Sequence, residues 1–228
     1  MRRGWLGVML LGLLAARPAA ACEEALLKAL WPDRAELPEA ARQPRRCDTA
    51  PGPAGATFVV VLEGETLYLG LAARGGTALA TGSADPLGFE SPWSASVEAA
   101  PETLLGPGQA AWRVTYTNSY LSTGRSTGTE AVHIVLRRGR SLDLVFASLV
   151  DARHRSEVPC HHRSSQPCRS GWVRRWTIEA AGPARRGHPP PDLLVRSRGS
   201  GAVVSRHRWR GTAYVPPVFD RTPPLGPN

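Results

Sequence analysis

Apolar side chains recur at every second position over most of this chain. Beyond Thr57, short runs of this kind are separated by Gly-bearing turns such as Arg138-Gly139. Alternation with a period of two is typical of strands, and such turns are typical of hairpins. The alternating apolar positions are Phe58, Val60, Leu62, Leu67, Leu69, Leu71, Val114, Tyr116, Tyr120, Val132, Ile134, Leu136, Leu142, Leu144, Phe146, Trp172, Trp176, Ile178, Leu193 and Val195.

These runs are not separated by helical segments long enough to cross over a parallel sheet. The pattern therefore predicts an all-β fold over residues 57–216, an antiparallel β-sandwich or open barrel built of hairpins. A helical period occurs only in residues 22–47, where Leu26, Leu27 and Leu30 form an apolar stripe. We therefore expect a short N-terminal helical segment that ends close to Pro32.

The remaining segments follow from composition. Residues 22–50 are expected to form a small helical cap, and residues 51–56 a Pro/Gly hinge between that cap and the β domain. Residues 217–228 form a Pro-rich tail that we expect to be frayed.

Residues 1–21 resemble a secretory signal peptide. Arg2 and Arg3 precede an apolar run, and Ala19 and Ala21 supply the small residues of a cleavage site. The run is shorter than the roughly 20 residues that span a bilayer, and no later segment approaches that length. We expect cleavage after Ala21, export to the periplasm or the extracellular space, and no transmembrane span.

The chain has four cysteines, at positions 22, 47, 160 and 168. An even count in an exported chain favours disulfides, here Cys22 with Cys47 and Cys160 with Cys168. A lipoprotein signal also ends in a cysteine, so an outer-membrane lipoprotein acylated on Cys22 is the alternative. Ala19 disfavours it, because that signal usually has Leu there.

The segment CHHRSSQPC, residues 160–168, places His161 and His162 between two cysteines. Zinc sites usually have cysteine pairs two to four residues apart, so this wider gap favours a disulfide-closed loop. We expect no metal and no cofactor.

Charge is unevenly distributed in a chain of formal net charge +9. Residues 22–136 contain 8 basic and 13 acidic side chains, a net charge of −5. Residues 137–210 contain 16 arginines and 5 acidic residues, a net charge of +11. Such asymmetry suggests an electrostatic partner for the basic half, unless the two halves neutralise each other across the fold or the arginines form a solvated face.

Two strands of the basic half interleave arginine with tryptophan, WVRRW at 172–176 and RHRWR at 206–210. Stacked Arg and Trp side chains suit anions and sugar faces. If the strands pair, arginines of one would lie beside arginines of the other and require a counter-ion. The alternative is that the tryptophans are core anchors and the arginines protect an edge. The candidate binding residues are Arg174, Arg175, Trp176, Arg206, Arg208 and Trp209.

In an exported protein, such a surface favours an anionic lipid, an acidic glycan or an acidic protein over nucleic acid. The sequence therefore predicts a non-enzymatic binding protein, with a purely structural envelope component as the alternative.

A serine hydrolase is a further alternative, because Gly124-Arg125-Ser126-Thr127-Gly128 matches the G-x-S-x-G of a nucleophile elbow. An elbow requires a helix after the serine, whereas residues 130–138 alternate like a strand. We therefore interpret this stretch as part of a hairpin and predict no catalytic residue.

Overall fold

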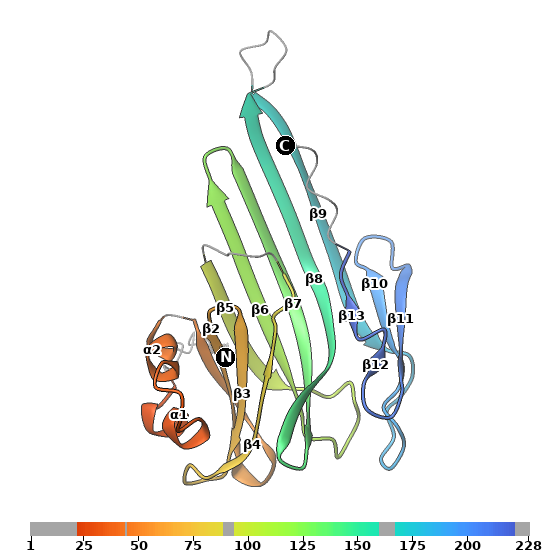
Figure 1. Cartoon of the computed structure of the whole chain (residues 1–228). Coiled ribbons are helices and arrows are strands. Elements are labelled where there is room, and N and C mark those ends of the chain that lie inside the picture. The colour runs from red at the N-terminus through yellow and green to blue at the C-terminus, as the bar shows by residue number, and fades with distance from the viewer. Residues whose placement is uncertain (1–21, 44, 89–93, 160–166, 222–228) are drawn as a thin grey trace, which may run out of the picture.

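The structure is a computed structural model that describes residues 22–43, 45–88, 94–159 and 167–221 (Figure 1). Two helices, α1 (Glu24–Leu30) and α2 (Leu37–Arg42), precede the strands, and η1 (Pro53–Gly55) is a single 3-10 turn. The strands are β1 (Cys47–Pro51), β2 (Thr57–Glu63), β3 (Thr66–Ala72), β4 (Ala78–Ala84), β5 (Ser94–Pro101), β6 (Ala111–Ser122), β7 (Arg125–Arg138), β8 (Ser141–Pro159), β9 (Pro167–Ala180), β10 (Leu193–Ser197), β11 (Val203–Trp209), β12 (Tyr214–Val215) and β13 (Val218–Phe219). The predicted all-β fold with a short N-terminal helical segment is confirmed.

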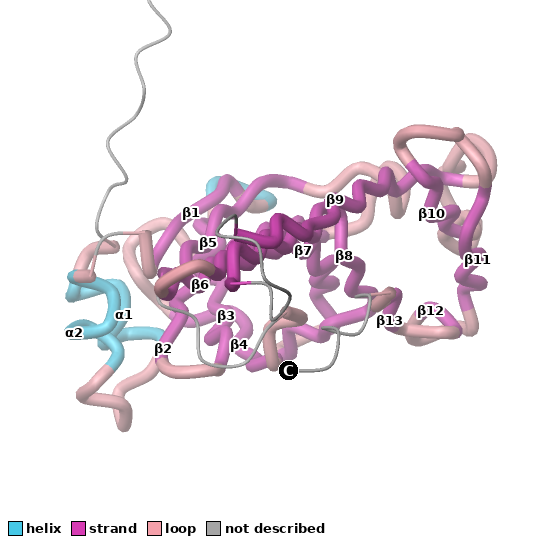
Figure 2. Tube along the Cα trace, turned by 90° about the horizontal axis from the view of Figure 1, so that it is seen from above, coloured by secondary structure: helices cyan, strands magenta, loops and turns pink. Residues whose placement is uncertain are grey.

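The first eight strands curl around one apolar core, in the order β1-β2-β3-β4-β8-β7-β6-β5 (Figure 2). At the open side of this ring, β5 lies beside the chain that leads into β1, and the Val97 amide donates to the Arg45 carbonyl at 2.9 Å. In the core, the Phe58 and Trp112 rings stack with centroids 4.7 Å apart. The alternating apolar positions of β2 and β3 thus face inward, as their period predicts. In β6, Val114 and Tyr116 do so as well, whereas Tyr120 is exposed.

Strand β2 is buried on both faces, which explains its continuous apolar run FVVVL. Phe58 and Val60 face the first core, whereas Val59 and Val61 pack under the helical cap formed by α1 and α2. The Cys22–Cys47 disulfide joins the start of this cap to β1, so this predicted bridge is confirmed. Helix α1 approaches β3 so closely that a Cβ on Gly70 would lie 2.6 Å from a Leu30 methyl.

The remaining strands form a second, smaller ring on the other side of β8. The order β8-β9-β10-β11-β12 is completed by β13, which returns to pair with β8 (Figure 2). A second apolar core fills this ring and includes Phe146, Trp176, Val195, Tyr214 and Phe219. The segment 217–228 is therefore not wholly frayed, since Phe219 is buried and anchors the ring.

Two pairings in the sheet are parallel, unlike the antiparallel hairpins that the sequence predicts. Thr81 of β4 lies opposite Ser141 of β8, and Val218 of β13 lies opposite Ala147. Each parallel contact closes one of the two rings, and a closing pair joins segments far apart in sequence. A hairpin pattern reports only neighbours in sequence and does not reveal such pairs.

Above the rings, β6, β7, β8 and β9 continue as a four-stranded ribbon (Figure 1). Strand β10 ends where Ser197 lies opposite Trp176, so the upper part of β9 pairs with β8 alone. The residues expected to form a hinge, 51–56, connect β1 to its antiparallel neighbour β2. No helix in the described ranges has the length and apolarity that a membrane span requires.

Candidate functional site

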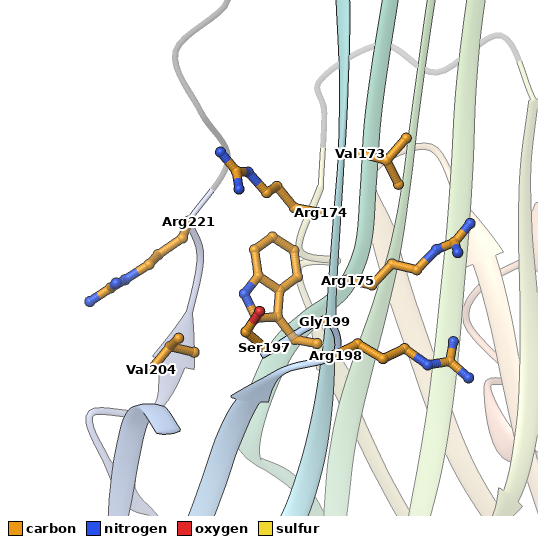
Figure 3. Close-up of a pocket in the computed structure, with 9 residues that line it drawn as sticks. Val173, Arg174, Arg175, Ser197, Arg198, Gly199, Val204 and Arg221 are labelled. Atoms are coloured by element: carbon orange, nitrogen blue, oxygen red, sulfur yellow. The ribbon is translucent and has the colours of Figure 1, made fainter. Parts of the chain in front are cut away.

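A pocket of about 680 Å³ opens where β10 ends beside β9 (Figure 3). Strand β9 supplies four of the nine lining residues, and the end of β10 with the turn after it supplies three. Strand β11 and the chain beyond β13 supply one residue each. The lining residues are Val173, Arg174, Arg175, Trp176, Ser197, Arg198, Gly199, Val204 and Arg221. Four of these nine are arginines, so the electrostatic potential in the pocket favours anions.

The strand period sets the directions of the arginines. Val173 and Arg175 extend from one face of β9, and Arg174 from the other, toward the chain that carries Arg221 (Figure 3). Arg198 extends on the Arg175 side, and its amide donates to the Arg175 carbonyl at 2.9 Å. Guanidinium groups therefore flank both faces of β9 at this point.

The four acidic side chains described between residues 137 and 210 are all paired with arginines. Arg175 Nε lies 2.9 Å from an Asp151 carboxylate oxygen. The other pairs are Arg138 with Asp143, Arg196 with Glu179 and Arg206 with Asp192, at 3.4, 2.8 and 3.9 Å. These pairs leave Arg174 and Arg198 without an acidic partner among the residues that the structure describes.

Each ion pair that the structure describes joins residues of the same half of the sequence. The pairs of the acidic half are Lys28 and Arg42 with Glu24, Arg34 with Glu36, and Arg113 with Glu102. The alternative in which the two halves neutralise each other through contacts across the fold therefore gains no support from these pairs. The excess positive charge stays on the surface of the second half.

The Trp176 side chain is a core anchor, as the simpler interpretation expects. It is buried, and its ring meets the Phe219 ring edge-on with centroids 5.6 Å apart. The Arg221 guanidinium lies 5.9 Å from the same Phe219 ring. The base of the pocket is thus a buried aromatic side chain, whereas Arg174 and Arg175 are exposed.

The other predicted strand, RHRWR, is not part of this pocket. Strand β10 lies between β9 and β11, so the expected contact between arginines of the two strands does not occur. Arg206 instead lies opposite Leu194 and near Asp192. Arg208 is exposed opposite Val215, and the Trp209 ring meets the Tyr214 ring edge-on at 5.2 Å. The like-charge argument for a counter-ion, which required these strands to pair, therefore does not apply.

Ser126 lies within β7, opposite Leu121 and Arg155. The turn before it is the two-residue connection Thr123-Gly124, with Gly124 at a φ of 75°. His154 pairs with Thr127 and Trp172, so its side chain projects from the opposite face to that of Ser126. His207 lies far along the chain from Ser126 and is enclosed in the second core between Phe146 and Phe219.

A buried polar cluster inside the first ring was missed by the sequence interpretation. Thr129 Oγ1 donates to Asn118 Oδ1 at 2.7 Å, and the Asn118 amide lies 3.4 Å from the Tyr116 hydroxyl. His133 is fully buried nearby, and its Nε2 accepts from the Leu87 amide at 2.9 Å. Burial lowers the pKa of His133 to about 4, so it is neutral at physiological pH. For Asn118 the sequence signal was a polar residue at an inward position, two residues after Tyr116.

The second predicted disulfide and the proposed zinc ligands of the same loop lie outside the residues whose side chains are described. Within the described ranges, no group of three or more His, Cys, Asp or Glu side chains could hold a metal ion. No protein family, curated protein or solved structure matches this chain.

Proposed function

We propose that this chain is an exported, non-enzymatic binding protein that holds an anionic partner in the pocket on β9. The observation that supports it best is that Arg174 and Arg198 line a pocket of about 680 Å³ beside the buried Trp176 and lack acidic partners among the described residues. A guanidinium group without an acidic partner can form charge-assisted hydrogen bonds with an anion, and the four arginines that line the pocket raise its positive potential.

Export is supported by the leader-like N-terminus and by the Cys22–Cys47 disulfide, because disulfides persist mainly in oxidising compartments. We assign the chain to the periplasm or the extracellular space. The partner is an anionic lipid, an acidic glycan or an acidic protein of that compartment. A structural envelope component remains the competing function, and it predicts no arginine-dependent ligand.

The test is binding of the purified chain to three immobilised polyanions: phosphatidylglycerol vesicles, heparin and poly-glutamate. At low salt we expect binding to at least one of them, and raising the salt concentration toward 0.5 M should weaken it because ions screen the arginines. The double variant Arg174→Gln/Arg198→Gln should bind about tenfold more weakly, equivalent to about 1.4 kcal/mol.

The matched control removes the same charge from β11, in Arg206→Gln/Arg208→Gln. It should lose much less affinity, since neither residue lines the pocket. Equal losses in the two double variants would mean that net charge, and not the pocket, drives binding. Wild-type binding that is absent, or unchanged by Arg174→Gln/Arg198→Gln, would refute the proposal.

A further inference from the structure

Strand β9 presents an unpaired edge directly beside the pocket. From Gly171 to Arg175 it pairs with β8 on one side, and the described part of the chain provides no strand on the other. Arg175 directs its carbonyl toward that open side, where it accepts from the Arg198 amide at 2.9 Å. Backbone groups of alternate residues point the same way, so the amide and carbonyl of Gly171 and Val173 also face the open edge.

An unpaired edge of this kind is a template for an added strand, and proteins usually shorten, cover or charge it to prevent that. Here the edge is in line with β10, whose last residue, Ser197, lies opposite Trp176. An extended peptide could therefore continue the line of β10 along β9, antiparallel to β9. Its backbone would bond to Gly171 and Val173.

The side chains along this edge define the peptide that would fit. Arg198 itself occupies the position opposite Arg175, so the first peptide residue that can pair lies opposite Arg174, and the peptide residue before it leaves the edge beside Arg198 (Figure 3). Both positions favour a carboxylate. The following residue lies opposite Val173, which is 56% exposed, and the one after it opposite the half-buried Trp172. Both of these positions favour apolar side chains.

From this edge and its charges, we propose that the anionic partner is an extended acidic peptide that adds to β9 as an antiparallel strand. Read from its N-terminus, the preferred segment is two acidic residues followed by two apolar ones. The inference rests on the proposed function, since the same arginines provide the charge. It adds that the backbone of β9 is itself part of the site.

The experiment uses a fluorescent peptide containing Glu-Glu-Val-Tyr in a Thr- and Ser-rich frame, with fluorescence anisotropy on the full chain. Three matched peptides accompany it. Two carry N-methyl groups at alternate backbone positions, one in each of the two possible phases, which removes donors and keeps every charge. The third reverses the order of the four central residues. We expect the parent peptide to bind, and both the reversed peptide and one N-methyl phase to bind at least about tenfold more weakly.

On the protein side, Val173→Pro removes a donor from the open edge, and proline is tolerated on an edge strand whose amide faces solvent. It should abolish peptide binding, whereas Val173→Thr should keep it. Circular dichroism and thermal unfolding of both variants check that the fold is retained. The N-methyl peptides test the same point on the unaltered protein, so the result does not depend on the proline variant being folded.

The outcomes separate this inference from the function on which it rests. Equal binding of the parent and both N-methyl peptides overturns strand addition and leaves an electrostatic site. Arginine-dependent binding to vesicles or heparin without peptide binding likewise overturns the inference and supports the proposed function. If no anionic probe shows binding that depends on Arg174 and Arg198, both are wrong.

Discussion

His133 is a polar residue at the centre of a strand that is buried on both faces. All six residues from Ala131 to Leu136 are buried, because Val135 faces the first core while Ile134 and Leu136 face the second. The period of the strand places His133 on the face opposite Val132, Ile134 and Leu136. That face is buried as well, since β7 is shared by two cores.

Burial makes His133 a source of acid sensitivity. Its pKa is about 4 in the folded chain, against an ordinary value of 6.5, so the unfolded chain binds the proton more strongly. Above pH 6.5 the histidine is neutral in both states and has no pH-dependent effect on the free energy of unfolding. As the pH falls from 6.5 toward 4, the free energy of unfolding decreases by about 3 kcal/mol.

We therefore predict a difference between the wild-type protein and His133→Gln that depends on pH. Glutamine can still accept from the Leu87 amide but does not titrate. Urea unfolding at pH 7.5 and pH 4.5 should show the wild-type protein losing about 2–3 kcal/mol more stability than the variant over that range. Parallel pH curves for the two proteins would contradict a buried neutral histidine.

At the residue scale, the sequence predicts only part of the candidate site. The WVRRW pattern singles out Arg174, Arg175 and Trp176, which line the same pocket because residues of one strand stay together in any β fold. It does not predict Arg198 or Arg221, which come from a turn and from the chain after β13. Their proximity depends on which strands pair, and no strand's own period contains that information.

At the element scale, the junction of β4 and β8 closes the first ring. Gly82 lies there, and a Cβ at its position would clash with the backbone carbonyl oxygen of Leu142. Backbone atoms cannot move away as a flexible side chain can, so glycine is required by the close approach of the two strands.

Gly82→Ala should consequently destabilise the protein by about 2 kcal/mol or more, a typical cost of overpacking. The matched control is Ser83→Ala on the same strand, where the side chain is exposed. Its stability should stay within about 0.5 kcal/mol of the wild-type value. Urea midpoints of the three proteins measure the effect. A Gly82→Ala variant as stable as Ser83→Ala would show that β4 and β8 do not approach each other in this way.

The strands themselves were predictable at the element scale, whereas their arrangement was only partly so. Alternation located β2, β3, β6, β7 and β9, because each places at least one face against a core. The short closing strand β13 has two residues in a Pro-rich context and shows no such alternation. Its place in the sheet depends on Phe219 entering the second core, a contact made with residues far away in sequence.

At the scale of the whole molecule, the two rings differ in charge as well as in position. The acidic half of the sequence forms the cap and most of the first ring, and the arginine-rich half forms the second ring and much of the ribbon. Because ion pairs between described residues stay within each half, the molecule is electrostatically asymmetric. Such an asymmetry orients an approaching polyanion toward the second ring before any contact forms.

The disulfide at Cys22 bears on how the N-terminus of the chain is processed. In the structure the Cys22 sulfur is bonded to Cys47, and a lipoprotein would require the same sulfur to carry diacylglycerol. The two modifications exclude each other. We therefore predict that the exported chain begins at Cys22 and carries no lipid. Its intact mass should be that of residues 22–228 less two hydrogens for each disulfide.

Peptide mapping without reduction should recover Cys22 linked to Cys47, and Cys160 linked to Cys168. Reducing the protein should then loosen the cap first. The bridge closes a loop of 25 residues, and its reduction raises the conformational entropy of the unfolded loop, which lowers stability by about 3 kcal/mol. Amide exchange in α1 and α2 should accelerate, while exchange in β6 and β7 stays slow because those strands line both cores. A chain with intact Met1 in the cytosol, or a diacylglycerol mass on Cys22, would contradict this account.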